Sequence, residues 1–392
     1  MKGRAAATKN VIGGMKICAW CLGRQYASSQ SEIEKAGLRA ASELGIRLSK
    51  DCELCGDVYG RRRKLERRIA DELRGVEFST FQVGVTLSND SVEREDEMRS
   101  KLRLSSGISL KKGLTTLFRK ELASSLHKKP SLRSPEVTIR IGLPEESVTV
   151  ERKPVTVYIE YLKLKRDIPI RAVPCRNCRG EGCAECDGTG IEKGDVSLEA
   201  ELTKSFLSAF AGRKVRVSWS GIEDESSLLV GNGRPAYIEV VSPARRATGL
   251  NWLNMTPSHG VQLTRAELEP LDRNRIEDLV KEVFIEAEFE SELGVADVIL
   301  LEQAYKERDL REAGNRKGRP KKVYAMKVVP RGTKARMHLF LDNGISLRQL
   351  LAPKADAGKG QEGPYPSLAD LLPANRIITA ESDIVGFRKT GY

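Results

Sequence analysis

The sequence has no long run of apolar residues, and its first residues contain no apolar core of the kind found in signal peptides. A membrane-spanning helix needs about 20 consecutive, mostly apolar residues. An export signal needs an apolar segment behind a basic start. We therefore expect neither membrane insertion nor export, and we expect a cytoplasmic location.

The sequence also has no leftover cysteine. Its 8 cysteines all fall in Cys-x-x-Cys pairs. In a reducing cytosol, such pairs are typical of tetrahedral zinc sites rather than disulfides. Two redox-active dithiols are an alternative, but they give no reason for four paired sets. The pairs are Cys18/Cys21, Cys52/Cys55, Cys175/Cys178 and Cys183/Cys186.

The two C-terminal pairs lie in one short run from Cys175 to Cys186, which glycines surround and interrupt. Glycine permits the tight turns of a zinc knuckle, so this run predicts a complete four-thiolate site. The two N-terminal pairs are joined by an insert long enough for a helix, and we expect them to form a second site. Both zinc ions would be structural, because four thiolates leave no open position for a water.

The length and the charge of the chain indicate how many domains it has and what kind of partner it binds. A chain of 392 residues suggests two or three domains. The chain has 66 Lys and Arg against 54 Asp and Glu, which gives a net charge of +12. This excess favours a polyanionic partner, with nucleic acid as the leading candidate.

The N-terminal half combines helical and strand patterns. Residues 1–14 are small, basic and without pattern, which predicts a disordered extension. Apolar residues with fourfold spacing lie beneath a dense basic surface in Arg61–Leu73. This surface is either a solvated helix face or a phosphate-facing one. Strand patterns follow at Phe81–Leu87, Val137–Leu143 and Val155–Tyr161.

An acidic loop in the second half is the candidate active site. Lys214–Trp219 and Ala236–Val241 alternate polar and apolar residues as half-buried strands do. Between them, Asp224 would lie at the end of a strand, where a carboxylate can be presented to a substrate as a nucleophile or base. A solvated turn is the alternative, because Asp, Glu, Ser and Gly are common in turns.

Three motifs in the chain are Gly221-Ile-Glu-Asp224 followed by Gly231-Asn-Gly-Arg-Pro235, Tyr161-Leu-Lys-Leu-Lys-Arg166, and Gly344–Leu351. Together they resemble motifs of one family, the archaeal and eukaryotic tRNA pseudouridine synthases that act on positions 54 and 55 of the TΨC arm. The first is similar to the family's Gly-Arg-Glu-Asp…Gly-x-Gly-Arg-Pro block. Tyr161-Leu-Lys-Leu-Lys-Arg166 resembles the end of its THUMP-like RNA-binding domain. Gly344–Leu351 is similar to its Gly-x-Tyr-Ile-(Lys/Arg)-x-Leu motif.

The resemblance implies an α+β fold. An N-terminal zinc-bearing THUMP-like RNA-binding domain would occupy residues 15–170, and a Cys-rich zinc knuckle residues 171–192. A pseudouridine-synthase-like domain with a mixed, mainly antiparallel sheet would occupy residues 193–392. The implied partner is tRNA, bound by a monomer.

The same resemblance implies the chemistry. Pseudouridine formation breaks the bond between ribose carbon 1′ and the base, rotates the uracil and rejoins it through carbon 5, without an organic cofactor. Asp224 would be the essential carboxylate and Arg348 the basic residue paired with it. Phe284 would stack on the flipped base, with Tyr324 as the alternative. Arg234 would contact the substrate.

The chain departs from the family motif around Asp224. Ile222 replaces the arginine before Glu-Asp, and Ser226 and Leu228 replace the Asp-x-Arg that follows. A second hypothesis is therefore a catalytically impaired, zinc-containing RNA-binding paralogue on the same scaffold. A J-domain-associated chaperone would explain the Cys175–Cys186 run, but it predicts several such modules and a His-Pro-Asp loop, and the sequence has neither.

Overall fold

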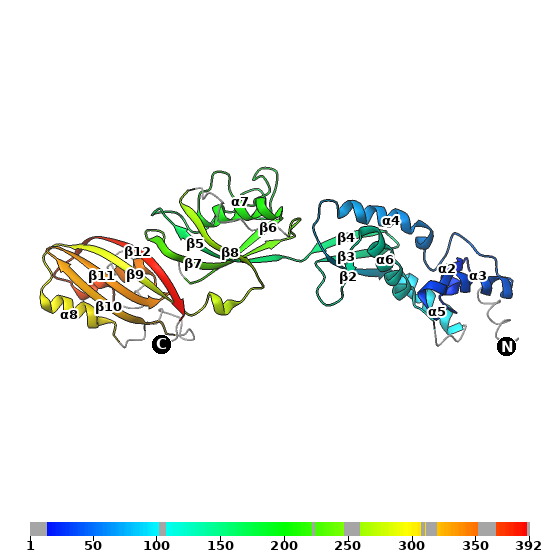
Figure 1. Ribbon diagram of the computed structural model, residues 1–392. Helices are drawn as coiled ribbons and strands as arrows, with labels where there is room; N and C mark the ends of the chain where they lie inside the picture. Colours follow the sequence, from blue (N-terminus) through cyan, green and yellow to red (C-terminus); the bar gives the residue numbers. More distant parts are fainter. Residues whose placement is uncertain are drawn as a thin grey trace. The chain divides into compact units, whose positions relative to one another are not determined.

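The computed structural model describes residues 14–101, 107–221, 224–246, 259–306, 310, 320–351 and 366–389. The chain divides into two compact units, Met1–Lys153 and Pro154–Tyr392. Both contain helices and strands (Figure 1). The predicted extension at residues 1–14 lies, except for Gly14, outside the described residues.

The first unit has a cysteine-containing helical part and a small sheet. Its sheet has four strands in the order β2-β1-β3-β4. β1 and β3 are parallel, and β3 and β4 are antiparallel. The elements are α2 (Ala19–Gly23), η1 (Gln30–Glu32), α3 (Ile33–Leu44), α4 (Val58–Glu72), β1 (Thr80–Leu87), α5 (Asn89–Lys101), α6 (Leu110–Leu126), β2 (Lys129–Pro130), β3 (Val137–Leu143) and β4 (Ser147–Arg152).

The buried side chains of this unit follow the spacing of apolar residues in its sequence. In α6, apolar side chains at fourfold spacing form one buried stripe that packs on β1. In β1, alternate residues such as Phe81 and Val83 are buried. α4 and α6 therefore lie against the sheet of this unit (Figure 1).

The second unit is built on one large sheet. It has eight strands, in the order β10-β11-β9-β12-β7-β5-β8, with β6 paired to β7. Only the short β12–β7 pairing is parallel. The strands are β5 (Val155–Lys163), β6 (Lys214–Trp219), β7 (Leu228–Val241), β8 (Val261–Leu268), β9 (Leu279–Phe289), β10 (Val323–Arg331), β11 (Lys334–Asp342) and β12 (Ile377–Lys389).

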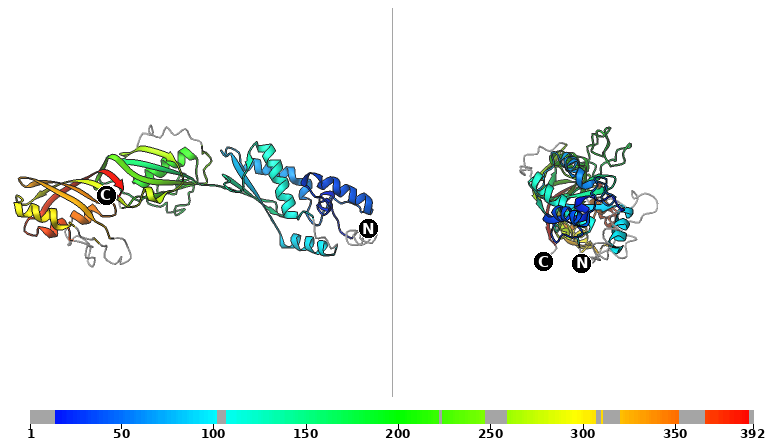
Figure 2. Two further views of the ribbon diagram at one scale, coloured as in Figure 1. Left: turned by 60° about the horizontal axis from the view of Figure 1, so that its bottom comes forward. Right: turned by 90° about the vertical axis from the view of Figure 1, so that its right-hand side faces the viewer.

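Short helices complete the second unit. In α7, the apolar stripe from Leu198 to Phe210 is buried in the core. α8 lies along β10 (Figure 2). The α+β class with a mixed, mainly antiparallel sheet is confirmed. The helices are α7 (Leu198–Phe210), η3 (Arg273–Arg275), α8 (Val295–Ala304), α9 (Leu347–Leu351) and α10 (Leu368–Leu371).

The boundary between the units differs from the prediction. The sequence predicts that Val155–Tyr161 belongs to an N-terminal domain that ends at residue 170. In the structure this strand, β5, lies between β7 and β8 in the second sheet. Its alternate residues, including Val157 and Ile159, enter the second core. The first unit therefore ends at Lys153.

Among the described residues, no helix combines the length and apolar character that crossing a membrane requires.

Candidate active site and metal centres

Asp224 is a buried carboxylate between two strands of the large sheet. β6 ends at Trp219 and β7 begins at Leu228. Only 5% of Asp224 is exposed to solvent. Ile222 and Glu223, which precede it, lie outside the described residues. The predicted position of Asp224 near the ends of these strands agrees with the structure, but its burial excludes the alternative of an ordinary solvated turn.

Both oxygens of the Asp224 carboxylate are bound. Its Oδ2 lies 3.3 Å from Nζ of Lys281, whose side chain is 0% exposed. Its Oδ1 accepts hydrogen bonds from the main-chain N–H of Leu347 at 3.0 Å and from Ser346 Oγ at 3.3 Å. The main-chain N–H of Arg348 lies 3.4 Å from the same oxygen. The carboxylate is therefore fixed by a buried ion pair and by the first turn of α9.

The cation that pairs with Asp224 is Lys281, not Arg348. Arg348 was predicted to pair through its side chain, but it contributes its main-chain N–H, and its side chain is exposed. Among the described residues, no ion pair joins Arg348 to Asp224. The reason is local: α9 begins at Leu347, so the free amides of its first turn face the carboxylate.

Phe284 lies on the wrong face of the sheet to stack on a base at Asp224. Successive side chains of a strand point to opposite faces. Lys281 and Phe284 are three residues apart in β9 and so occupy different faces. The Phe284 ring stacks on His338, with centroids 4.4 Å apart, and Arg336 lies 4.6 Å above it. This prediction is corrected: Phe284 belongs to an aromatic and cationic cluster on the opposite face.

Tyr324, the alternative aromatic residue, is accessible. It is 46% exposed, and its hydroxyl donates to Asp342 Oδ1 at 2.9 Å. Asp342 also lines a cavity of about 600 Å³ near the loop that carries Asp224. The lining residues are Trp219, Gly221, Ile276, Glu277, Asp278, Leu279, Pro320, Lys321, Asp342, Asn343 and Gly344.

Arg234 supports the scaffold instead of facing a substrate. It is 1% exposed. Its Nε and Nη2 donate to the carbonyl oxygen of Ser220 at 3.1 and 3.0 Å, and Nη2 also donates to Asn343 Oδ1 at 2.7 Å. A Cβ at Gly221 would lie 2.9 Å from Asn343. The loop after β6 therefore packs closely against the loop after β11. The predicted substrate contact of Arg234 is therefore replaced by a role in joining these loops.

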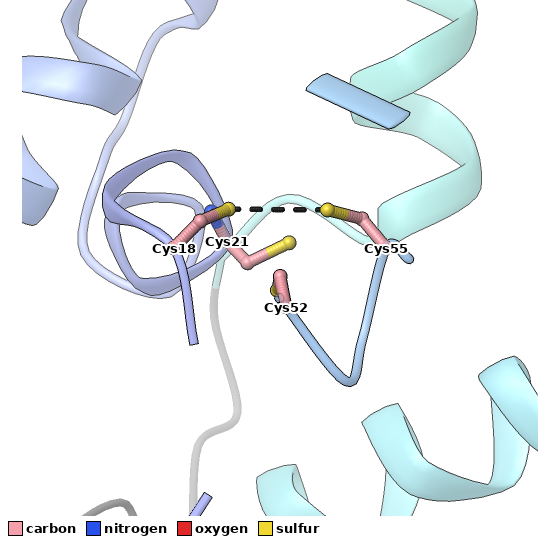
Figure 3. A group of neighbouring side chains, drawn as sticks. All are labelled: Cys18, Cys21, Cys52 and Cys55. Carbon is pink, nitrogen blue, oxygen red and sulfur yellow. Dashed lines mark hydrogen bonds between the residues drawn. The ribbon is translucent and has the colours of Figure 1, made fainter. Parts of the chain in front are cut away.

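The first cysteine cluster joins two distant segments. Cys18 caps α2, Cys21 lies within that helix, and Cys52 and Cys55 lie in the turns before α4. Figure 3 shows the four side chains converging, with Sγ of Cys18 and Cys55 3.9 Å apart. All four sulfur atoms lie within 4.8 Å of one another. The predicted pairing of the two N-terminal Cys-x-x-Cys motifs is confirmed.

The second cluster is formed within one short run. Sγ···Sγ distances are 4.0 Å for Cys175 and Cys183, 3.8 Å for Cys178 and Cys186, and 3.7 Å for Cys183 and Cys186. A tetrahedron with metal–sulfur bonds of about 2.3 Å has sulfur atoms about 3.8 Å apart. The main-chain N–H groups of Gly182 and Gly190 also donate to sulfur atoms. Both clusters therefore fit a tetrahedral metal ion with four thiolate ligands.

Comparison with known proteins agrees with this architecture. Residues 65–142 match the family model of the archaeal Pus10 THUMP domain. The chain is 31% identical to a tRNA pseudouridine synthase Pus10 of Cenarchaeum symbiosum, over 59% of the chain and 58% of that protein. It is 29% identical to the protein of the same name from Methanothrix thermoacetophila, over 94% of the chain and 91% of that protein.

Other matches are partial or weak. The match to the Nitrosopumilus maritimus protein of the same name, at 27% identity, covers 59% of the chain and 60% of that protein. A chain in the crystal structure of a Cbf5-Nop10-Gar1 complex matches with a TM-score of 0.27 and 10% identity, over 58% of this chain and 49% of that one. By sequence, the chain is thus similar to archaeal tRNA pseudouridine synthases named Pus10, and its residues 65–142 are similar to their THUMP domain.

Proposed function

We propose that the protein is a tRNA pseudouridine synthase that acts at positions 54 and 55 of the TΨC arm, with Asp224 as its nucleophile. The names of its relatives support the reaction class. The observation that carries the assignment to Asp224 is its buried carboxylate, held by Lys281 beside the end of β6. A carboxylate of this kind is fixed before the substrate arrives, which favours attack on a reacting nucleotide.

Lys281 has a clear electrostatic role in this proposal. A buried carboxylate without a partner is unstable, because burial removes the water that solvates its charge. The ammonium of Lys281 compensates for that loss, and the N–H of Leu347 and the hydroxyl of Ser346 orient the other oxygen. The carboxylate of Asp224 would attack carbon 1′ of the ribose as the bond between that carbon and N1 of the base breaks. The base would rotate, and its carbon 5 would then attack carbon 1′ and release the Asp224 carboxylate. Carbon 5 loses its proton, and N1 gains one.

Tyr324 is the aromatic residue that we propose for contact with the flipped base. A base taken out of its stack needs a new stacking partner, and Tyr324 is exposed while its hydroxyl is anchored on Asp342. Replacing Tyr324 with Phe retains the ring and removes the hydrogen bond to Asp342, whereas replacing it with Leu removes both. We expect a smaller loss of kcat for Tyr324→Phe than for Tyr324→Leu. Equal rates for all three proteins would contradict this role.

The proposed reaction is tested with an unmodified tRNA transcript. The purified protein should convert uridine to pseudouridine at position 54, position 55 or both, as detected by position-resolved mapping. A transcript with cytidine at both positions is the matched control and should remain unmodified. Conversion only at other positions would exclude the proposed target. The absence of any conversion of a transcript that is demonstrably bound would favour the second function below.

We further propose that both cysteine clusters hold zinc. Four thiolates at tetrahedral spacing select zinc over harder cations and leave no open position, so the ions would stabilise the fold and take no part in the reaction. Metal analysis should find two zinc ions per chain, and one in the Cys175→Ser or Cys52→Ser variant. Exposed Ser28→Ala is the control and should retain both. Fewer than two ions in the unaltered protein, after preparation without chelators, would contradict the prediction.

The first unit offers a surface for the tRNA backbone. On α4, Arg61 pairs with Glu146 and Arg62 with Glu121. The exposed side chains of Arg63, Lys64 and Arg67 form no ion pair with any described residue. Unpaired cations on one helix favour phosphate binding over the alternative of a merely solvated face. We therefore propose that this helix contacts tRNA.

Salt dependence tests this surface. Binding to tRNA should weaken as salt rises, because bound phosphates release their counterions. Replacing Arg63, Lys64 and Arg67 with Ala should lower the slope of log K against log salt by about 2 to 3. Alanine at the paired residues Arg74 and Arg140, on the same unit, is the control. An unchanged slope in the triple variant would exclude α4 from the interface.

A second function rests on the changes around Asp224. Ile222 replaces the arginine of the family motif, and Ser226 and Leu228 replace its Asp-x-Arg. These changes favour an RNA-binding paralogue with impaired catalysis. That protein would bind tRNA with the same salt dependence but would form no pseudouridine.

A further inference from the structure

A second buried lysine holds the loop that carries Asp224. Lys163 is the last residue of β5 and is 0% exposed. Its Nζ donates to the carbonyl oxygen of Asp224 at 2.8 Å and to that of Glu225 at 2.7 Å. Lys163 therefore binds the main chain of the catalytic candidate, whereas Lys281 binds its side chain.

The residues that follow Lys163 extend this contact. The main-chain N–H of Asp167 donates to the carbonyl oxygen of Glu225 at 2.8 Å. Nη1 of Arg166 donates to the carbonyl oxygen of Ser226 at 3.0 Å. The carbonyl oxygens of residues 224, 225 and 226 are thus all bound by one segment, Lys163–Asp167, which we call the β5 clamp.

The β5 clamp is itself fixed to the large sheet. Nη1 of Arg166 also donates to the carbonyl oxygen of Ser382, and its Nη2 pairs with Asp383, both at 2.7 Å. Ser382 and Asp383 lie in β12, and the hydroxyls of Ser227 and Ser382 are 2.6 Å apart. The loop is therefore attached to β5 and β12, two strands that are far apart in the sequence.

Burial of an ammonium group is costly unless its hydrogen bonds are satisfied. A lysine used only to fill the core could be replaced by an apolar side chain without that cost. The contacts of Lys163 with two successive carbonyl oxygens restrict the loop directly behind the Asp224 side chain. A displacement of about 1 Å in a reacting group can lower a rate about a hundredfold.

We infer that Lys163 is a positioning residue, which holds the main chain of Asp224 so that its carboxylate meets the reacting nucleotide. The catalytic part of this inference rests on the proposed function. Lys163 itself would not touch the substrate. Its loss should lower kcat and leave the KM for tRNA nearly unchanged, because the tRNA surface is not altered.

The test uses Lys163→Met in the full-length protein. Met retains most of the apolar side chain and removes the ammonium. Amide hydrogen exchange at residues 225–228 should become about ten times faster, and kcat should fall about 10- to 100-fold. Lys204→Met is the matched control, since Lys204 also donates to a main-chain carbonyl oxygen, that of Asp195 at 2.5 Å. In the Lys204→Met variant, amide hydrogen exchange at residues 225–228 and kcat should both remain unchanged.

Arg166→Gln provides a second variant if Lys163→Met does not fold, because Arg166 is partly exposed and binds the same loop. It should also accelerate exchange at residues 225–228 and lower kcat, by a smaller factor. Unchanged exchange in a folded Lys163→Met protein would overturn the inference, as would faster exchange with an unchanged kcat. If the unaltered protein forms no pseudouridine, the proposed function fails, and the exchange measurement still decides whether the clamp holds the loop.

Discussion

Lys281→Met is expected to lower both the stability of the second unit and its activity. The variant leaves the carboxylate of Asp224 buried without the ammonium that lies 3.3 Å from it. Removing one partner of a buried ion pair typically costs about 3–5 kcal/mol of unfolding free energy. The rate of pseudouridine formation should fall at least about a hundredfold, because the carboxylate loses the ammonium that holds its Oδ2 in position. Denaturant unfolding and single-turnover rates measure the two effects.

Two further variants isolate the ion pair. Lys389→Met is the control, because Lys389 is exposed and donates to the carbonyl oxygen of Glu277 at 2.8 Å. It should change stability by less than about 0.5 kcal/mol. The double variant Lys281→Met with Asp224→Asn should be more stable than Lys281→Met alone, because it no longer buries a lone charge. Equal stability of these two proteins would show that the pair contributes nothing.

The metal clusters were the most predictable part of the structure. The Cys175–Cys186 run contains all its ligands within a few residues, so local spacing predicted a complete site. The first cluster required the two pairs Cys18/Cys21 and Cys52/Cys55 to meet. The absence of any leftover cysteine indicated that they would.

Lys281 was missed, although the sequence contains a signal for it. Along β9, the residues of the core face are apolar at Leu279, Val283, Ile285, Ala287 and Phe289. Lys281 interrupts this alternation at a position where an apolar residue is expected. A lysine on the buried face of a strand needs a partner. The partner could not be predicted, because Asp224 is 57 residues away and only the sheet brings the two together.

The errors at Phe284 and β5 have different physical causes. Motif position alone predicts Phe284 as the stacking residue, but the twofold period of β9 places it on the face opposite to Lys281. β5 has the pattern of a strand, and its existence was predicted correctly. Its partners were not, because the pairing of β5 with β7 and β8 depends on contacts far along the chain. An alternating pattern predicts that a strand forms better than it predicts which strands pair with it.

Asp224→Asn is expected to have the largest effect on catalysis. Asn has nearly the shape of Asp, but it lacks the negative charge and cannot act as the nucleophile. The variant leaves the buried ammonium of Lys281 without its carboxylate, so its unfolding free energy should fall. The affinity of the folded variant for tRNA should remain close to that of the unaltered protein, because the tRNA-binding surface is unchanged. With a single essential nucleophile, the rate should fall by about three or more powers of ten. Asp297→Asn on α8, where the carboxylate accepts from the main-chain N–H of Gly294, is the matched control.

The most direct test of the central claim is a single-turnover experiment with protein in excess over an unmodified tRNA transcript. Tritium at carbon 5 of uridine is released when that carbon is joined to the ribose, so its release measures the reaction itself. The unaltered protein and Asp297→Asn should release tritium at similar rates, whereas Asp224→Asn should bind the same tRNA and release tritium at least about a thousand times more slowly. Equal release by the unaltered protein and by Asp224→Asn would show that another group carries the reaction and would contradict the site proposed here.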